Sequence, residues 1–169
     1  MLQKPGHHGV SGQMQSKPAK RSEGQSGIPV IEPEGVVVER WGNPDVLDLV
    51  RDDPSVVIGK GEILFKEGDA ADCMYIVRNG TLRIRSGSIV YEDVIAGGMV
   101  GEMAMVEGGM PRTAMVYALT VSEIVKIDEP RFFSLIAEAP TFARTVMRVL
   151  SRRLRRMDKL YRADEWAER

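Results

Sequence analysis

The sequence predicts a mostly β protein with flanking helices, in which short strands form an antiparallel roll, barrel or sandwich. Three observations indicate this class. Seventeen Gly and nine Pro among 169 residues are typical of a chain with many turns. Short apolar runs alternate with turn residues through the middle of the chain. The last third carries helical periodicity instead.

The strands are expected where apolar and β-branched residues run between turns. The expected segments are Ser55–Ile58, Glu62–Lys66, Met74–Val77, Thr81–Arg85, Ile89–Ile95, Thr113–Ala118 and Ser122–Ile127. Asn79-Gly80 is the strongest hairpin signal, because this pair accepts the positive φ angles of a two-residue turn. A short helix is expected at Pro44–Val50, with Asn43 as its N-cap.

The chain divides into three parts by composition. Residues 1–35 contain six Gly, four Pro, four Ser and four Gln and no aromatic residue. Such a segment buries too little apolar surface to offset its ordering entropy, so a disordered tail is expected. Residues 36–140 carry the β-rich body with its flanking helices, and residues 141–169 form a long C-terminal helix.

Helical spacing begins at Glu129–Glu138, stops at Pro140 and resumes over Phe142–Arg162. The second helix has two apolar stripes. Phe142, Val146 and Val149 form a short stripe that is expected to pack on the body. The longer stripe has heptad spacing and predicts a dimer seam; it contains Met147, Leu150, Leu154, Met157 and Tyr161.

The long helix is also strongly basic. Residues 142–162 hold eight Lys or Arg and one acid, for a charge of +7, whereas the whole chain carries −1. The rest of the chain therefore carries −8. Three interpretations are open: a solvated helix face, a surface for a partner helix or an acidic protein, and a nucleic-acid site.

The inventory of reactive residues excludes several classes of site. His7 and His8 are the only histidines, and Cys73 is the only cysteine. We therefore expect no metal centre, no intramolecular disulfide and no catalytic residue. No apolar run reaches the length of a membrane span, and no secretory signal begins the chain. A cytoplasmic protein without membrane contact is expected.

One segment, residues 99–114, carries a pattern suited to an anion. Gly101 opens a predicted helical turn, whose free N–H groups favour negative charge. Arg112 offers a planar fork for phosphate oxygens, and Thr113 adds a hydroxyl. Glu102 can accept a hydrogen bond from a ribose hydroxyl. This set predicts a small sugar-phosphate ligand.

The same segment resembles the phosphate-binding cassette of cyclic nucleotide-binding domains. The resemblance lies in Gly101-Glu102-Met103-Ala104, in Arg112-Thr113-Ala114 and in the ten residues from Glu102 to Arg112, a spacing that is similar to the catabolite activator branch of the family. It implies a jelly-roll-like β-roll with a short phosphate-binding helix and a long C-terminal helix. It also implies that Glu102 takes the ribose 2′-hydroxyl, while Arg112, Thr113 and the Ala104 amide hold the cyclic phosphate.

The resemblance also extends to the long helix. By count from the cassette, the base-contacting pair of the activator branch falls on Met157 and Asp158, and these residues with Arg153 are expected as base or lid contacts. Only seven residues follow Arg162, too few for the family's helix-turn-helix domain. The prediction is a non-catalytic cyclic AMP or cyclic GMP sensor that needs no cofactor, dimerises through its C-terminal helix and reads no DNA sequence. Its downstream effector is unknown. The alternative is a ligand-independent module whose basic helix binds nucleic acid or an acidic protein.

Overall fold

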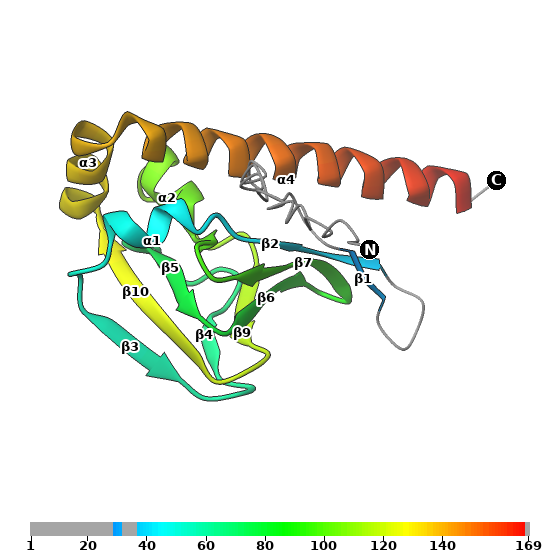
Figure 1. Ribbon diagram of the computed structural model, residues 1–169. Coiled ribbons are helices and arrows are strands. Elements are labelled where there is room, and N and C mark those ends of the chain that lie inside the picture. Colours follow the sequence, from blue (N-terminus) through cyan, green and yellow to red (C-terminus); the bar gives the residue numbers. More distant parts are fainter. Residues whose placement is uncertain (1–28, 32–36, 168–169) are drawn as a thin grey trace, which may run out of the picture.

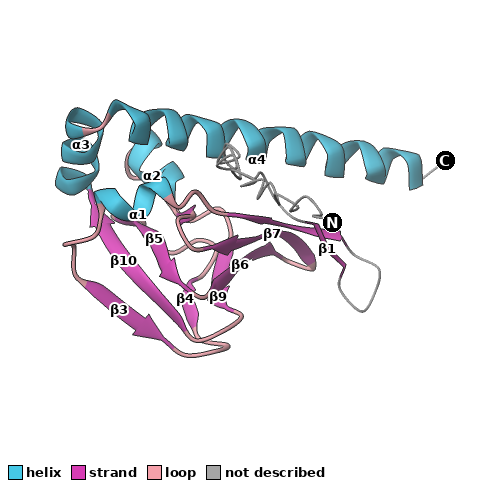
Figure 2. Cartoon of the chain, viewed as in Figure 1, coloured by secondary structure: helices cyan, strands magenta, loops and turns pink. Residues whose placement is uncertain are grey.

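The protein is a two-sheet roll covered by helices (Figures 1 and 2). The computed structural model describes residues 29–31 and 37–167, with side chains described from 38 to 159. Within that part, one sheet has the order β1 (Pro29–Ile31), β2 (Val37–Trp41), β7 (Ile89–Ile95), β6 (Thr81–Ser86), β9 (Met115–Ala118) and β4 (Ile63–Phe65). The other has the order β3 (Ser55–Ile58), β10 (Ser122–Asp128), β5 (Cys73–Asn79) and β8 (Met99–Val100). The predicted antiparallel β-roll is confirmed; the β2–β7 pair differs, because it is parallel.

Asn79-Gly80 does not form the predicted hairpin. β5 and β6 lie in different sheets, so this turn carries the chain from one sheet to the other. Gly80 has φ +89°, and a Cβ atom there would lie 2.6 Å from the Val121 carbonyl oxygen. A turn does form at this pair, with a positive φ angle at Gly80 only, but the pairing of the two strands is decided by distant partners. The β6–β7 hairpin forms instead around Gly87.

The predicted tail needs one correction. Pro29–Ile31 forms β1 and pairs with β2 in an antiparallel arrangement, so these three residues are not disordered. The remaining expectation for residues 1–28 and 32–36 lies outside the described residues. Composition did not predict this strand, because its three residues form it only by pairing with β2. β2 and β8 were not predicted either.

The helices are α1 (Asp45–Leu49), α2 (Glu102–Glu107), α3 (Glu129–Glu138) and α4 (Pro140–Ala167). α1 starts one residue later than predicted, with Pro44 at the N-cap, although the Asn43 Oδ1 atom still accepts from the Asp45 amide at 3.3 Å. At α3 the Asp128 carboxylate accepts from the Arg131 amide at 3.0 Å and caps the helix. Figure 1 shows α4 running across the top of the roll and projecting beyond its strands.

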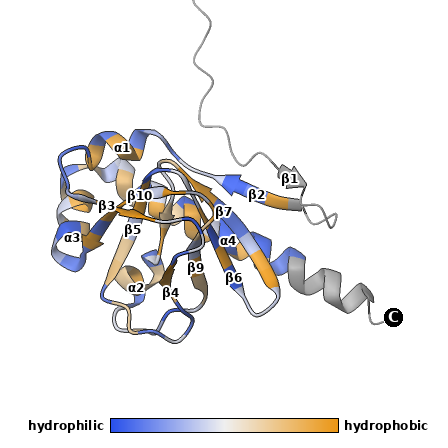
Figure 3. Ribbon diagram, turned by 90° about the horizontal axis from the view of Figure 1, so that it is seen from below, coloured by the Kyte–Doolittle hydropathy of each residue, from blue (hydrophilic) through white to orange (hydrophobic). Residues whose placement is uncertain are grey.

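The described residues form two hydrophobic clusters. One lies inside the roll between the sheets and includes Val77, Leu82 and Ile124. The other lies between the four-stranded sheet and the helices. Figure 3 shows the strands largely hydrophobic and the connecting loops hydrophilic. Phe142, Val146 and Val149 are at most 4% exposed, so the short stripe packs on the body as predicted.

The predicted dimer seam has a mixed environment in the single chain. Met147, Leu154 and Met157 are 61%, 66% and 48% exposed, whereas Leu150 packs partly against the helical core cluster. The Tyr161 side chain lies outside the described residues. Among the described residues, no helix has both the length and the apolar character needed to cross a membrane.

Candidate functional site

Gly101 forms the turn at which the Arg112 side chain approaches the start of α2. It joins β8 to α2 with φ +77° and ψ 13°, in the left-handed region. A Cβ atom at this position would lie 2.4 Å from the Arg112 Nη1 atom. Only glycine therefore permits both the backbone angle and the close approach of the guanidinium. The Ala104 amide lies 3.3 Å from the Gly101 carbonyl oxygen, a long and weak first contact of α2.

Arg112 is a buried cation with weak partners. Two backbone hydrogen bonds fix its main chain: the Arg112 amide donates to the Asp69 carbonyl at 2.9 Å, and the Gly68 amide donates to the Arg112 carbonyl at 2.8 Å. The guanidinium donates to the Gly101 carbonyl at 3.3 Å and to the Cys73 sulfur at 3.5 Å, and it lies 4.2 Å from the centre of the Phe65 ring.

Within the described part of the chain, no carboxylate forms an ion pair with Arg112, and its buried Nε atom has no hydrogen-bond partner. A buried charge is costly unless it is paired. The residue is therefore suited to an anionic ligand.

Glu102 is the first residue of α2 and is fully buried. Its Oε1 atom contacts the Arg153 Nη1 atom as an ion pair. Neither carboxylate oxygen has a hydrogen-bond partner in the described residues, so the contact is close but poorly aligned. A buried carboxylate in this condition can accept a hydroxyl hydrogen from a ligand.

A second acid, Glu92 on β7, lies beside the same helix. It is 1% exposed and contacts two of the α4 arginines that face the roll. Arg153 Nε donates to Glu92 Oε1 at 2.7 Å, and Arg152 Nη2 lies 2.6 Å from Glu92 Oε2. Arg153 Nη2 donates to the Met99 carbonyl at 2.9 Å. Arg152 also stacks on Trp41, at 4.8 Å from the ring centre.

The charges of this cluster shift one another's pKa. Burial tends to raise the pKa of Glu92, but the Arg153 and Arg152 guanidiniums outweigh it and hold that pKa below its ordinary value of 4.5. Burial tends to lower the pKa of Arg153, but Glu102 and then Glu92 raise it above its ordinary range. Burial lowers the pKa of Arg152. Glu92 and Arg153 are therefore charged at neutral pH.

These residues surround a cavity of about 360 Å³, within the size range of small-molecule sites. The roll supplies an apolar wall that includes Phe65, Ile84, Tyr91 and Val116, and α4 supplies Arg153, Arg156 and Met157. Arg112 and Glu102 mark the polar end. Among the described residues, the cavity thus combines the Arg112 cation without a carboxylate partner, the Glu102 carboxylate with both oxygens lacking a hydrogen bond, and an apolar surface for a flat group.

The structure brings most of the predicted site residues together. The cavity is lined by Gly101, Glu102, Met103, Ala104, Arg112, Thr113, Arg153 and Met157. Thr113 is exposed at its edge, with its Oγ1 atom 3.7 Å from the Met103 sulfur. Asp158 is exposed and is not among the lining residues.

Glu92 and Tyr91 were missed by the sequence analysis. The signal was present, since Glu92-Asp93 is a pair of acids in the middle of the apolar run Ile89–Ile95. The basic helix also differs from all three interpretations in one respect. Three of its arginines face the roll, where Arg152 and Arg153 bind Glu92, and Arg156 lies 3.3 Å from Glu39 on β2.

Comparison with known proteins gives matches in several classes. The chain is 30% identical over 105 residues to a lysophospholipase, nte1, of Neurospora crassa, which covers 59% of this chain and 7% of the relative. It is 32% identical over 102 residues to the CRP-like cAMP-activated global transcriptional regulator of Mycobacterium tuberculosis, covering 57% of this chain and 45% of the relative. The chain thus spans less than half the length of these curated relatives.

Solved structures agree on the fold. The catabolite activator protein of Thermus thermophilus matches with a TM-score of 0.61 and 23% identity, covering 73% of this chain and 60% of that one. The family model described as "Cyclic nucleotide-binding domain" matches residues 55–139, which include the whole of the cassette. The chain belongs to the cyclic nucleotide-binding domain family.

Proposed function

We propose that the cavity binds a cyclic purine mononucleotide, cyclic AMP or cyclic GMP, and that the protein is a sensor that acts by binding and not by catalysis. The observation that carries the proposal is the buried Arg112 guanidinium without a carboxylate partner in the described residues, facing the same cavity as Glu102. A cyclic phosphate carries one negative charge and would compensate Arg112. Family membership and the cAMP-activated relative support the same ligand class.

In this proposal Glu102 determines the orientation of the ligand, because it binds the ribose end. Its two buried oxygens have no hydrogen-bond partner among the described residues, and a ribose 2′-hydroxyl would satisfy one of them. The apolar wall of Ile84, Tyr91 and Val116 would then face the purine. Ligand contacts on α2 and α4 would favour conformations in which α4 stays close to the roll. This is a population shift, and an effector protein could bind one of the two conformations selectively.

The test is a calorimetric titration in which both partners are changed. Cyclic AMP is compared with its 2′-deoxy analogue, on the wild-type chain and on Glu102→Gln. The wild type should bind the deoxy analogue about 10- to 100-fold more weakly, since a hydrogen bond to a charged group is lost. In Glu102→Gln the two ligands should differ much less. Equal binding of both ligands by the wild type would contradict the assignment of Glu102.

The choice of base is a separate question, which involves Asp158. A carboxylate can accept the ring N–H and the amine of guanine together, whereas adenine offers only its amine on that edge. In the single chain Asp158 is exposed and does not line the cavity. Competitive titration of both nucleotides against the wild type and Asp158→Ala decides the point. A selective loss of cyclic GMP affinity in Asp158→Ala assigns guanine reading to Asp158, and equal losses for both nucleotides, or no loss, assign Asp158 to the helix surface.

We also propose that a second copy of the chain pairs with α4. Met147, Leu154 and Met157 are exposed in one row of that helix, at heptad spacing. These three side chains lie outside the apolar stripe that packs on the roll, whereas Leu150 of the same seam already packs partly against the helical core. The effector that reads the sensor, and the cytoplasmic location, stay predictions.

The alternative function, a ligand-independent interaction module, is favoured by one observation. Arg144, Arg148, Arg155 and Lys159 are all exposed on α4. A thermal-shift screen with cyclic mononucleotides and with DNA separates the two functions. A module without a ligand shows no shift with nucleotides. Binding of DNA through these side chains should weaken steeply with salt and show no sequence preference.

A further inference from the structure

Arg153 lies between two buried carboxylates, and it divides its donors unequally. Glu92 comes from β7 and Glu102 from the start of α2, and the two are 1% and 0% exposed. Arg153 Nε donates to Glu92 and Nη2 to the Met99 carbonyl, at 2.7 and 2.9 Å. Nη2 also lies 2.6 Å from Glu92 Oε1. Only Nη1 contacts Glu102, and it does so outside hydrogen-bond geometry.

This division leaves Glu102 with a neighbouring charge but no hydrogen bond within the described residues. Folded proteins rarely leave a buried carboxylate oxygen without a donor, since the lost solvation is costly. If Glu92 were absent, Arg153 could turn its aligned Nε and Nη2 donors toward Glu102. That carboxylate would then be satisfied within the chain, and a ligand would have to break the pair to reach it.

We propose that Glu92 is a positioning residue that holds Arg153 away from full engagement with Glu102. The Glu102 carboxylate thereby stays available for a ligand hydroxyl, and α4 stays attached to the roll when the ligand takes Glu102. The role of Glu102 in this inference rests on the proposed function. The anchoring of α4 by Glu92 does not, because it follows from the contacts of the chain alone.

The local charges fit this division of work. Two carboxylates face two guanidiniums, since Arg152 Nη2 also lies 2.6 Å from Glu92 Oε2. The pair Glu92–Arg152 is balanced by itself, and Arg112 is left to compensate a ligand phosphate. With Glu92 neutral, two guanidiniums share Glu102 as their only acid of this cluster. Arg153 then loses its partner on β7 and is drawn toward Glu102, the carboxylate that the ligand needs.

The decisive test uses two variants and a matched control of the full chain in calorimetric titrations with cyclic AMP and cyclic GMP. Glu92→Gln should weaken binding at least about tenfold, the equivalent of one hydrogen bond to a charged group. Adding Arg153→Gln to it should restore affinity about tenfold, because Glu102 then has no competitor. A double variant that binds as weakly as Glu92→Gln, or more weakly, would overturn the proposal.

The matched control is Asp93→Asn on the same strand. Asp93 is fully buried and its Oδ1 atom lies 2.8 Å from Arg83 Nε, but its side chain points to the other face of β7 and does not line the cavity. The Asp93→Asn substitution removes an equally buried charge, and the nucleotide affinity of this variant should stay near that of the wild type. An equal loss in the control would show that any buried charge in β7 has the same effect, which contradicts a specific role for Glu92.

A ligand-free measurement separates this inference from the proposed function. Amide hydrogen exchange of residues 149–159 should rise much more in Glu92→Gln than in Glu102→Gln, because Glu92 contacts two arginines of α4, Arg153 through a hydrogen bond and Arg152 as an ion pair, whereas within the described residues Glu102 contacts Arg153 alone as an ion pair. The reverse order contradicts the anchoring role. A wild-type chain that binds neither nucleotide contradicts the proposed function, and the exchange result then decides the role of Glu92. Should Glu92→Gln fail to fold, Glu92→Gln with Arg152→Gln keeps the local charge balanced and carries the same expectation.

Discussion

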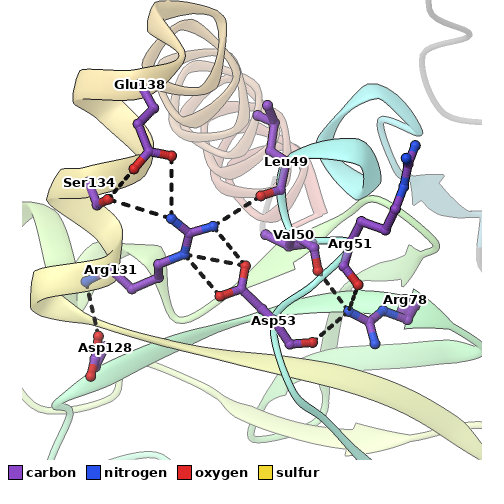
Figure 4. A network of polar contacts seen from close by, with 9 residues as sticks. All are labelled: Leu49, Val50, Arg51, Asp53, Arg78, Asp128, Arg131, Ser134 and Glu138. Carbon is purple, nitrogen blue, oxygen red and sulfur yellow. Dashed lines mark hydrogen bonds and ion pairs between the residues drawn. The ribbon is translucent and has the colours of Figure 1, made fainter.

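Two arginines of this protein have opposite environments, although both lie where several elements meet. Arg131 on α3 is saturated: it binds the Asp53 carboxylate at 2.9 Å, the Leu49 carbonyl at 3.1 Å and Glu138 at 3.5 Å (Figure 4). Arg112 beside α2 has a long bond to a carbonyl, a sulfur and an aromatic ring. Within the described residues, Arg112 is the more buried of the two and has no carboxylate partner.

The difference separates a structural arginine from a binding one. Figure 4 shows Arg131 joining α3 to the segment between α1 and β3, while Arg78 of β5 donates to the Val50 and Asp53 carbonyls of the same segment at 2.7 and 2.9 Å. All three guanidinium nitrogens of Arg131 donate to partners inside the chain. Arg112 has only long, weak partners and a buried Nε atom without a partner among the described residues, which is the physical basis of the proposed function.

The largest effect is expected at Arg112. Arg112→Met should weaken cyclic nucleotide binding by about 30- to several-thousand-fold, the equivalent of about 2–5 kcal/mol for a buried charge-assisted contact. The melting temperature should stay close to that of the wild type, because the variant removes an unpaired buried charge. Calorimetry and thermal unfolding measure the two. A variant that binds normally, or one that unfolds, breaks the comparison.

The comparison extends to exposed apolar side chains. Met147→Glu with Leu154→Glu places charges on the predicted seam and should raise the dimer dissociation constant at least about hundredfold, since each buried charge is costly. Sedimentation equilibrium measures this. Phe133 on α3 is 55% exposed but lies outside the seam, so Phe133→Glu is the matched control and should leave the dimer intact. A wild-type chain that is monomeric at high micromolar concentration removes the seam.

Arg131→Met should show the reverse of Arg112→Met. We expect a loss of about 1–3 kcal/mol of unfolding free energy, since the Asp53 carboxylate and the Leu49 carbonyl lose their donor. Nucleotide affinity should change by less than about threefold, because Arg131 does not line the cavity. Denaturant unfolding and calorimetry test the two parts. A large loss of affinity with normal stability would place Arg131 in the binding machinery.

The smallest effect is expected from pH. The pKa of Glu92 in the folded chain lies below its ordinary value of 4.5. Its ion pairs therefore stabilise the folded state fully above pH 4.5, and this contribution disappears as pH falls through the folded pKa. Unfolding free energy measured between pH 6 and 3 should fall less steeply in Glu92→Gln than in the wild type. Parallel curves would show that Glu92 is not stabilised by Arg152 and Arg153.

Much of this site was predictable because its signal is local. Gly101, Glu102 and Arg112 lie within twelve residues, and the turn needs a glycine wherever the rest of the chain goes. The apolar runs likewise marked most strands, and Pro140 marked the break between the last two helices, although α4 begins at Pro140, two residues before the predicted Phe142. Such features depend on neighbours in sequence.

The features that were missed depend on distant partners. Asn79-Gly80 has the chemistry of a hairpin turn, but β5 pairs with β10 and β8, and β6 with β7 and β9. Helical periodicity places Arg152 and Arg153 on one side of α4, but it does not show that Glu92 lies opposite them. Charge counting recorded the +7 of the helix and the −8 of the rest separately, whereas the fold pairs part of one with part of the other.

The measurement that tests the central claim most directly is a calorimetric titration of the wild type, Arg112→Met and Arg131→Met with cyclic AMP and cyclic GMP, beside the thermal unfolding of each chain. The account predicts one-to-one binding by the wild type and by Arg131→Met, and loss of binding in Arg112→Met with its melting temperature preserved. A wild-type chain that binds neither nucleotide, or an Arg112→Met variant that binds as the wild type does, would contradict it.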